Sequence, residues 1–186
     1  MAIKWPGFKD LRVHENVDFA VGSGCRINGM AIDNNGVEVC PVKPKVRIGN
    51  NLHAAAGCVI RTSDHDFRRG FPMVNRFVSG YAAADVVIGD DVWIGNSVLI
   101  MKGVTIGDGA VIQARSVVVS NIPRLAIAGG HPCRTFAYRD EEEYDFFKSL
   151  NLTNVSMAKI VESKEFFAQK FAEFQAEKAK RLAPPA

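Results

Sequence analysis

Hydrophobic residues recur every six positions through the middle of the chain. Isoleucine or valine occupies the same place in six consecutive hexads, at Ile88, Ile94, Ile100, Ile106, Ile112 and Val118. Two residues earlier, each hexad has a second small or apolar residue, at Val86, Val92, Val98, Val104, Ala110 and Ser116. Heptad repeats and amphipathic helices have other periods. The pattern therefore indicates a repeat architecture that is neither a coiled coil nor an amphipathic helix.

Each hexad predicts a three-residue strand followed by a turn of Gly, Asp, Asn or Ser. The first and third side chains of such a strand face the same way. Three strands per coil close a triangular tube, so three hexads, or 18 residues, complete one coil. Like positions then stack about 4.8 Å apart. This predicts an all-β fold, a parallel β-helix of hexapeptide repeats, and leaves the hand of the coil open.

The same pattern occurs upstream, at residues 46–63 and 19–30. Its register breaks at residues 34–45 and again over 64–85, where we expect an excursion loop. The middle position of each hexad should point out of the tube, and most of these residues are apolar: Val87, Trp93, Leu99, Thr105, Val111 and Val117. A contiguous apolar row is usually covered, so we expect it to pack against another copy of the chain.

Helical patterns replace the repeat after Arg134. Phe167, Phe171 and Phe174 share one helical face. We expect this face to pack on the tube or on a symmetry mate, with a membrane-surface helix as the alternative. The expected organisation is a repeat domain over 1–136 and a C-terminal helical extension over 137–186.

The composition excludes several classes of protein. The chain has 186 residues, of which 47% are hydrophobic and 23% charged, as in a folded globular protein. Its net charge of +3 is thinly spread, so no nucleic-acid partner is expected. No apolar run approaches the roughly 18 residues that span a bilayer, and no secretory signal is evident. We expect a cytoplasmic protein without membrane association.

The cysteines do not suggest a metal or redox site. They stand at wide spacings, without a CxxC motif, at Cys25, Cys40, Cys58 and Cys133. Each is expected to be a small buried hydrophobic residue.

The stretch from Ile48 to Arg134 contains VVIGDDVWIGNSVLIMKGVTIGDGAVIQARSVVVSNIP and AGGHPCR. It resembles the hexapeptide-repeat acyltransferases, and within them the galactoside and maltose O-acetyltransferases and the colanic-acid-type polysaccharide acetyltransferases. The resemblance implies a left-handed parallel β-helix, against the usual preference for right-handed crossovers. It also implies a homotrimer whose active sites lie at the subunit interfaces, with acetyl-CoA in the cleft between neighbours.

The resemblance places the catalytic histidine at His65, in TSDHDF. A sugar hydroxyl needs a base that accepts its proton as it attacks a thioester, and histidine suits that exchange. If the upstream register persists, His65 points outward like Trp93, and Asp64 and Asp66 point the other way. A backbone carbonyl is then an alternative partner for orienting the imidazole.

Two further residues are expected to support His65. Trp93 is open to two interpretations, as cover for a trimer seam and as a neighbour of the catalytic histidine. Asn35 is expected to bind the acceptor hydroxyl, and a one-residue shift would select Asn34 instead.

Six positions match those with which the family lines the pantetheine arm and the nucleotide: Gly95, Asn96, Ala114, Val119, Ser120 and Arg134. Ser120 stands where a lysine is usual and Ala137 where a further basic residue occurs, so two phosphate contacts are missing. Arg115, where many members have glycine, can compensate together with Arg134 through charge-assisted hydrogen bonds. A solvated turn residue is the alternative for Arg115.

We therefore expect an acetyl-CoA-dependent O-acetyltransferase that acts on a carbohydrate hydroxyl of a bacterial surface polysaccharide or sugar precursor. Transfer is expected to be direct, with His65 as general base and no metal. His53 and His65 should lie two faces apart, which argues against the zinc site of γ-class carbonic anhydrases.

The acceptor side leaves alternatives open. The protein can instead be an N-acetyltransferase of an amino nucleotide-sugar, an antibiotic acetyltransferase, or a catalytically idle β-helix scaffold. In the excursion, Arg68, Arg69 and Arg76 are candidates for meeting an acidic sugar or the phosphate of a nucleotide-sugar.

Overall fold

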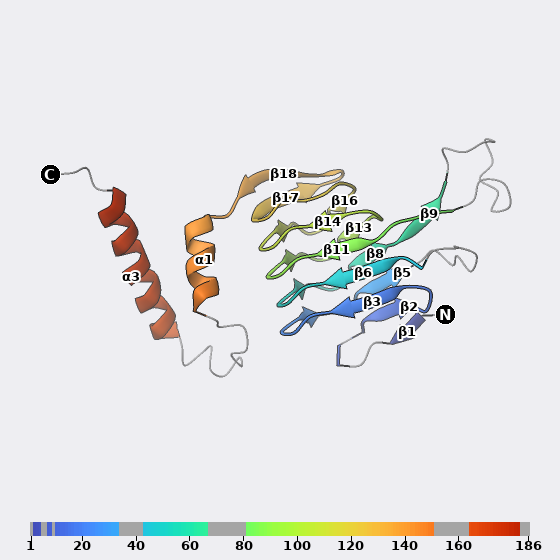
Figure 1. The fold of residues 1–186 in the computed structure, drawn as a ribbon, viewed down its shortest axis with the longest axis horizontal. Helices are drawn as coiled ribbons and strands as arrows, with labels where there is room; N and C mark the ends of the chain where they lie inside the picture. Colours follow the sequence, from blue (N-terminus) through green and yellow to red (C-terminus); the bar gives the residue numbers. More distant parts are fainter. Residues whose placement is uncertain are drawn as a thin grey trace. The chain divides into compact units, whose positions relative to one another are not determined.

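The computed structural model describes residues 2–4, 7–8, 10–33, 43–66, 81–150 and 164–182. The chain divides into two compact units, Met1–Arg139 and Asp140–Ala186. The first is a stack of β-coils and the second is helical (Figure 1). The last strand of the tube continues past the boundary predicted at residue 136, because it folds back on the strand before it.

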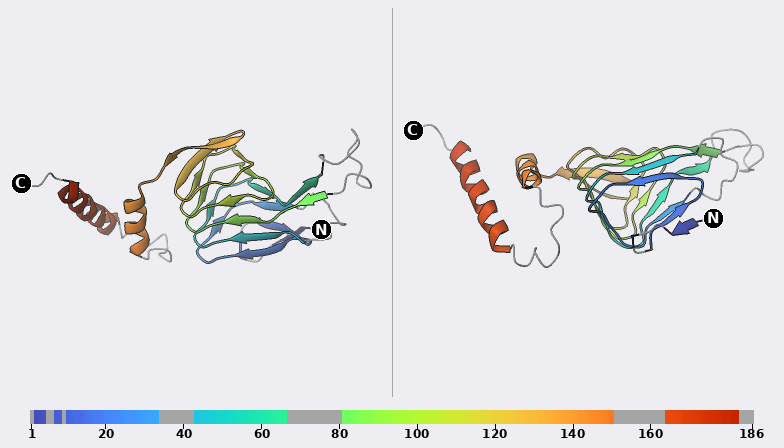
Figure 2. Two further views of the ribbon diagram at one scale, coloured as in Figure 1. Left: turned by 45° about the horizontal axis from the view of Figure 1, so that its top comes forward. Right: turned by 60° about the horizontal axis from the view of Figure 1, so that its bottom comes forward.

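Each complete coil contributes one strand to each of three sheets, here called faces 1, 2 and 3. In spatial order, face 1 contains β14 (Thr105–Ile106), β11 (Val86–Ile88), β6 (Lys45–Ile48) and β3 (Asp18–Val21). Face 2 contains β18 (Cys133–Tyr138), β17 (Ala126–Gly130), β15 (Val111–Ile112), β12 (Trp93–Ile94), β7 (His53–Ala54) and β4 (Arg26–Ile27). Face 3 contains β1 (Ala2–Lys4), β2 (Arg12–His14), β5 (Ala31–Asp33), β8 (Val59–Arg61), β13 (Leu99–Ile100) and β16 (Val117–Val118). The coils have a triangular outline in the right-hand view of Figure 2.

The predicted coil length and core are confirmed. Ile88 pairs with Ile106, Trp93 with Val111 and Leu99 with Val117, each 18 residues apart, in parallel ladders. The twelve inward residues of the six hexads are at most 1% exposed. Ser116 is the one polar residue among them. Its hydroxyl donates to the Gln113 carbonyl oxygen at 2.7 Å and accepts from the Gly130 N–H at 3.1 Å, which offsets the cost of burying it.

The corner between faces 1 and 2, here called corner 1/2, is closed by side chains that bond to the backbone of the preceding coil. Asn50 Oδ1 accepts from the Ser23 N–H at 2.9 Å, and Asp90 Oδ1 accepts from the Asn50 N–H at 2.7 Å. Asp108 Oδ1 accepts from the Asp90 N–H at 2.8 Å. A Cβ added at Gly89 would lie only 2.2 Å from Asp108 Oδ1, so this ladder leaves room for nothing larger than glycine.

The outward residues form three columns. Val87 stacks with Thr105 on face 1, Trp93 with Val111 on face 2, and Leu99 with Val117 on face 3. The single outward apolar row expected from the sequence is therefore divided, because successive hexads turn onto different faces. Face 3 has the longest apolar column among the described outward residues, formed by Ala31, Val59, Leu99 and Val117.

The C-terminal unit contains α1 (Glu141–Ser149) and α3 (Lys164–Leu182), so the predicted helices are confirmed. Asp140 caps α1 by accepting from the Glu143 N–H at 3.0 Å. The ring of Phe174 stacks on Phe146 at 4.8 Å between centroids, and Phe171 stacks on Phe147 at 5.9 Å. Phe171 and Phe174 of the predicted aromatic face thus pack on α1, and not on the tube or the symmetry mate expected from the sequence. Among the described residues, no helix is both long and apolar enough to cross a membrane.

Candidate active site

His65 lies on a hairpin that leaves the stack at the corner between faces 3 and 1, here called corner 3/1 (Figure 1). In this hairpin β9 (Ser63–His65) runs antiparallel to β10 (Tyr81–Ala83), with His65 opposite Tyr81. The Ala84 N–H donates to the Thr62 carbonyl oxygen at 3.0 Å and closes the neck. Val87, and not His65, takes the place beside Arg47. The predicted register for His65 is therefore wrong, because the hairpin carries it out of the coil.

The base of the hairpin is anchored in the coil below it. Thr62 is fully buried, and both its N–H and its hydroxyl donate to the Asp33 carbonyl oxygen, at 3.0 and 3.1 Å. Asp64 Oδ1 accepts from the backbone N–H of His65 at 2.9 Å. The His65 Nδ1 atom is buried, while the residue as a whole is half-buried. The carboxylate beside His65 therefore fixes its backbone, and the imidazole has one enclosed edge.

Trp93 lies on face 2, which is the side of the triangle opposite corner 3/1. It is 41% exposed and stands between His53 and Val111 in the outward column. A single chain therefore places His65 and Trp93 on opposite sides of the tube. Only a second copy can bring a tryptophan from this position next to the histidine hairpin.

Five of the predicted cofactor residues gather at or above the corner between faces 2 and 3, here called corner 2/3. Asn96, Ala114 and Arg115 are exposed there, and the Arg115 N–H donates to the Asn96 carbonyl oxygen at 2.8 Å. Gly95 is buried, and a Cβ on it would lie 2.5 Å from the Ala114 nitrogen. Its small size is thus required for coil packing. Arg134 is exposed on β18, opposite Gly129.

Arg115 adopts a left-handed backbone conformation, with φ of 60°. This conformation favours glycine, which accounts for the glycine expected at this position. An arginine in this conformation has a higher backbone free energy than a glycine, and interactions of its side chain or of the rest of the fold must offset that difference.

The other two predicted cofactor residues lie at corner 3/1, the corner that carries the histidine hairpin. Val119 is 49% exposed and Ser120 is exposed, directly after β16. They lie two coils beyond the hairpin, or about 10 Å along the axis. The predicted cofactor residues therefore divide between two corners at the two ends of face 3.

Asn35, its alternative Asn34, and the arginines Arg68, Arg69 and Arg76 lie outside the described residues. No group of three or more His, Cys, Asp or Glu that could hold a metal occurs within the part of the chain that the structure describes. Burial raises the pKa of the thiols of Cys25, Cys58 and Cys133.

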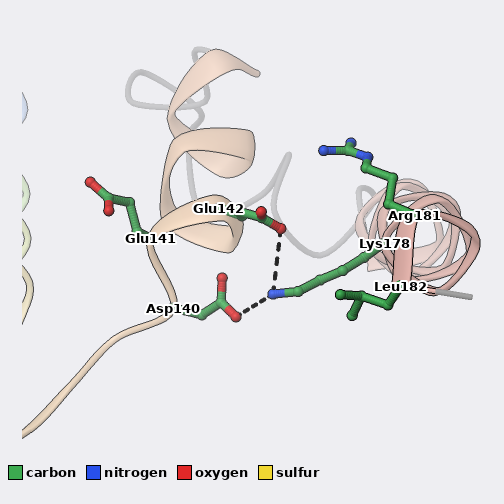
Figure 3. Close-up of a pocket in the computed structure, with 6 residues that line it drawn as sticks. All are labelled: Asp140, Glu141, Glu142, Lys178, Arg181 and Leu182. Carbon is green, nitrogen blue, oxygen red and sulfur yellow. Dashed lines mark hydrogen bonds and ion pairs between the residues drawn. The ribbon is translucent and has the colours of Figure 1, made fainter. Parts of the chain in front are cut away.

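A pocket in the C-terminal unit is lined by charged side chains that form ion pairs (Figure 3). Lys178 Nζ bonds Asp140 and lies 3.6 Å from Glu142 Oε2. Arg181 pairs with Glu177 at 3.0 Å. The two pairs of Lys178 join α3 to the start of α1, whereas the Arg181–Glu177 pair lies within α3.

The sequence does not predict one alignment on face 2. Arg26, His53 and Trp93 occupy successive places in the same outward column. They are 27 and 40 residues apart, because both register breaks intervene. Only the observed strand pairing shows that they are neighbours.

Comparison with known proteins agrees with this architecture. The profile of the bacterial transferase hexapeptide family (six repeats) matches residues 85–120. A chloramphenicol acetyltransferase from Agrobacterium fabrum is 41% identical over 85 residues, which are 45% of this chain and 41% of that protein. Galactoside O-acetyltransferase from Escherichia coli is 35% identical over 104 residues, 55% of this chain and 49% of that protein. The chain therefore spans about half, or less, of the length of these curated relatives.

The structural similarity extends further. The crystal structure of a maltose O-acetyltransferase from Clostridium difficile 630 superposes with a TM-score of 0.53 and 31% identity, over 72% of this chain and 68% of that chain. The left-handed parallel β-helix implied by the resemblance is thereby confirmed. The chain belongs to the bacterial hexapeptide-repeat acetyltransferases.

Proposed function

We propose that this protein is an acetyl-CoA-dependent O-acetyltransferase that acts on a carbohydrate hydroxyl. The observation that carries the proposal is the shared position of His65, Val119 and Ser120 at corner 3/1. An extended pantetheine arm lying along this corner would run from the exposed residues above it to the histidine hairpin. The galactoside and maltose acetyltransferases among the relatives support a sugar acceptor.

The proposed reaction is a direct transfer. The acceptor hydroxyl oxygen attacks the thioester carbonyl carbon while His65 takes the hydroxyl proton. The tetrahedral intermediate then collapses, the C–S bond breaks, and His65 returns the proton to the departing CoA sulfur. Histidine suits both transfers because its ordinary pKa lies near the working pH.

The three cysteines within the described residues support direct transfer over an acyl-cysteine route, whereas Cys40 lies outside those residues. Only a thiolate is a competent sulfur nucleophile. Burial raises the pKa of Cys25, Cys58 and Cys133, so their thiols stay protonated at neutral pH. Ser116 is also buried, with its hydroxyl bonded to the backbone of the tube.

We propose that the active unit is a homotrimer. Cyclic assembly joins two different surfaces of neighbouring copies. The apolar column of face 3 and the apolar end of the face 2 column, Val111 and Ile127, provide such a pair. This arrangement would bring Trp93 of one copy toward the histidine hairpin of the next. It would also place corner 2/3 of one copy, with Asn96, Ala114 and Arg115, beside a cofactor held at corner 3/1 of its neighbour.

A second candidate is acetylation of an antibiotic hydroxyl, which the similarity to chloramphenicol acetyltransferases favours. Such an enzyme would share His65 and acetyl-CoA and differ only in the acceptor. An N-acetyltransferase of an amino nucleotide-sugar and a catalytically idle scaffold are two further candidates. Substantial activity after loss of His65 would favour amine transfer, because an amine can attack without a dedicated base.

Calorimetric titration of acetyl-CoA into the purified protein tests the donor site without knowledge of the acceptor. We expect saturable binding in the micromolar range. A thiol-release assay then compares maltose, galactosides, acidic oligosaccharides and chloramphenicol as acceptors, with His65→Ala as the inactive control. Absence of acetyl-CoA binding would overturn the enzyme proposal and leave the scaffold. Preference for chloramphenicol would replace the sugar acceptor with the antibiotic.

A further inference from the structure

Face 2 presents an unusual series of side chains toward solvent. Arg26 pairs in register with His53, and His53 pairs in register with Trp93. All three residues are exposed. Neighbouring strands lie about 4.8 Å apart, so a guanidinium, an imidazole and an indole line up side by side. The strands β4, β7 and β12 are two residues long, so each presents a single outward side chain here.

Two acidic side chains of the adjoining corner between faces 1 and 2 bond to groups of that corner. On the adjoining corner 1/2, Asp90 accepts from the Asn50 N–H at 2.7 Å, and Asp91 Oδ1 accepts from Asn51 Nδ2 at 2.8 Å. The face 2 column itself has no acidic member among its described residues, Arg26, His53, Trp93, Val111 and Ile127. The series is therefore cationic at one end and aromatic at the other.

The other two faces lack this combination. On face 1 the outward Arg47 pairs with Asp18 at 2.6 Å, and its neighbours in the column are the aliphatic residues Ala20 and Val87. On face 3 the outward Arg12 is followed by the aliphatic residues Ala31 and Val59. An arginine beside an imidazole and a planar aromatic ring occurs only on face 2 among the described columns.

We propose that Arg26, His53 and Trp93 form a subsite for an anionic carbohydrate. A sugar ring would lie against the indole of Trp93, whose flat apolar face suits the C–H face of a pyranose. A carboxylate or phosphate on that sugar, or on the next residue of the chain, would bond to Arg26 and His53. This inference rests on the proposed function for the nature of the acceptor, and it adds a charge specificity which that function does not contain.

Tryptophan fluorescence tests the subsite without any acetyl donor. In a Trp5→Phe background Trp93 is the single tryptophan, since the chain has two. We expect trigalacturonate, which carries carboxylates, to change this fluorescence saturably, and neutral maltotriose to bind at least tenfold more weakly. Glucose 6-phosphate tests the phosphate source of the same chemistry, and binding by either anion supports the subsite. Equal binding of maltotriose and trigalacturonate, or no binding by either anion, would overturn it.

The variants separate the subsite from a general surface charge. The Arg26→Gln, His53→Gln double variant should weaken trigalacturonate binding at least tenfold, whereas Arg26→Lys alone should retain affinity within about threefold. Arg12→Gln removes an exposed arginine from the outward column of face 3 and should leave binding unchanged. An equal loss in Arg12→Gln would show only nonspecific attraction and contradict the proposal.

The experiments distinguish failure of the subsite from failure of the proposed function. A protein that binds trigalacturonate but not acetyl-CoA would keep the subsite and lose the enzyme. A protein that acetylates neutral and acidic sugars equally would keep the enzyme and lose the subsite.

Discussion

Two corners of the same tube contrast in how their polar residues are used. At corner 1/2 each of three successive coils bonds by an Asn or Asp side chain to the backbone of the coil before it, through Asn50, Asp90 and Asp108. At corner 3/1 the corresponding bonds are interrupted. Asp85 accepts from the Lys45 N–H and Asn121 from the Thr105 N–H, but Gly103 stands between them without a side chain.

Under the proposed function, stability and chemistry therefore lie at separate corners of the tube. The continuous ladder at corner 1/2 fixes the spacing of the coils and engages acidic residues that would otherwise be candidates for catalysis. The interrupted corner accommodates the hairpin of His65 and exposes Val119 and Ser120. Substitutions at corner 1/2 should therefore lower the free energy of unfolding, whereas substitutions at corner 3/1 should lower the activity.

The largest effect is expected from His65→Ala. Loss of a general base lowers kcat by roughly 10²–10⁴-fold. Because His65 lies on a hairpin outside the stack, the unfolding midpoint should change little. Steady-state kinetics and thermal denaturation measure the two quantities. His14→Ala is the matched control, and retention of most activity in His65→Ala would remove the histidine from the mechanism.

Gly89→Ala should have the opposite profile. The new Cβ would lie 2.2 Å from Asp108 Oδ1 and 2.8 Å from the Asp108 nitrogen. Overpacking of this kind costs about 1–3 kcal/mol of unfolding free energy. Denaturant unfolding measures the loss, and the activity of the folded fraction should be preserved. In the double variant Gly89→Ala, Asp108→Ala the carboxylate obstacle is gone, so the two effects should be less than additive.

Asp90→Ala removes one step of the ladder. The Asn50 N–H would lose its acceptor at 2.7 Å, which we expect to cost about 1–2 kcal/mol of unfolding free energy. Asp90→Asn keeps an acceptor oxygen and should lose less than half as much. Equal losses in both variants would mean that charge, and not the hydrogen bond, stabilises this corner.

Arg115→Gly distinguishes the two interpretations of this residue at corner 2/3. Glycine relieves the left-handed backbone at φ of 60°, so stability should rise by up to about 1 kcal/mol. If the guanidinium binds the cofactor phosphates, KM for acetyl-CoA should rise about threefold to tenfold at unchanged kcat. An unchanged KM would assign Arg115 to the solvated turn.

The smallest effect is expected in the C-terminal unit, where an ion pair between Lys178 and Asp140 stabilises the helices. The hydrogen bond from Lys178 lowers the pKa of the Asp140 carboxyl below its ordinary value of about 3.9. The stability that this hydrogen bond adds is therefore present above about pH 3.9, and it is lost as the pH falls through the lower pKa that Asp140 has in the folded protein. Helicity followed by circular dichroism during acid titration should decline at higher pH in Lys178→Met than in the wild type. Coincident titrations would show that the pair adds nothing.

The six-residue period determines the greater part of the fold. An inward residue at every sixth position permits only short strands that stack coil on coil, and the observed 18-residue pairing follows from that spacing. The C-terminal helices are predictable for the same reason, because Phe171 and Phe174 share a helical face. Local periodicity is sufficient in both cases, since each element repeats its own burial pattern.

The tertiary structure alone decides which distant residues become neighbours. The antiparallel pairing of β9 with β10 lifts His65 out of the register in which the sequence places it, so that Val87 and not His65 lies beside Arg47. The two breaks in the repeat likewise hide the alignment of Arg26, His53 and Trp93. A repeat specifies the position of a residue within a coil. After an insertion of arbitrary length, the sequence no longer shows which residues of successive coils are neighbours, and only the hydrogen-bonded pairing of the strands shows it.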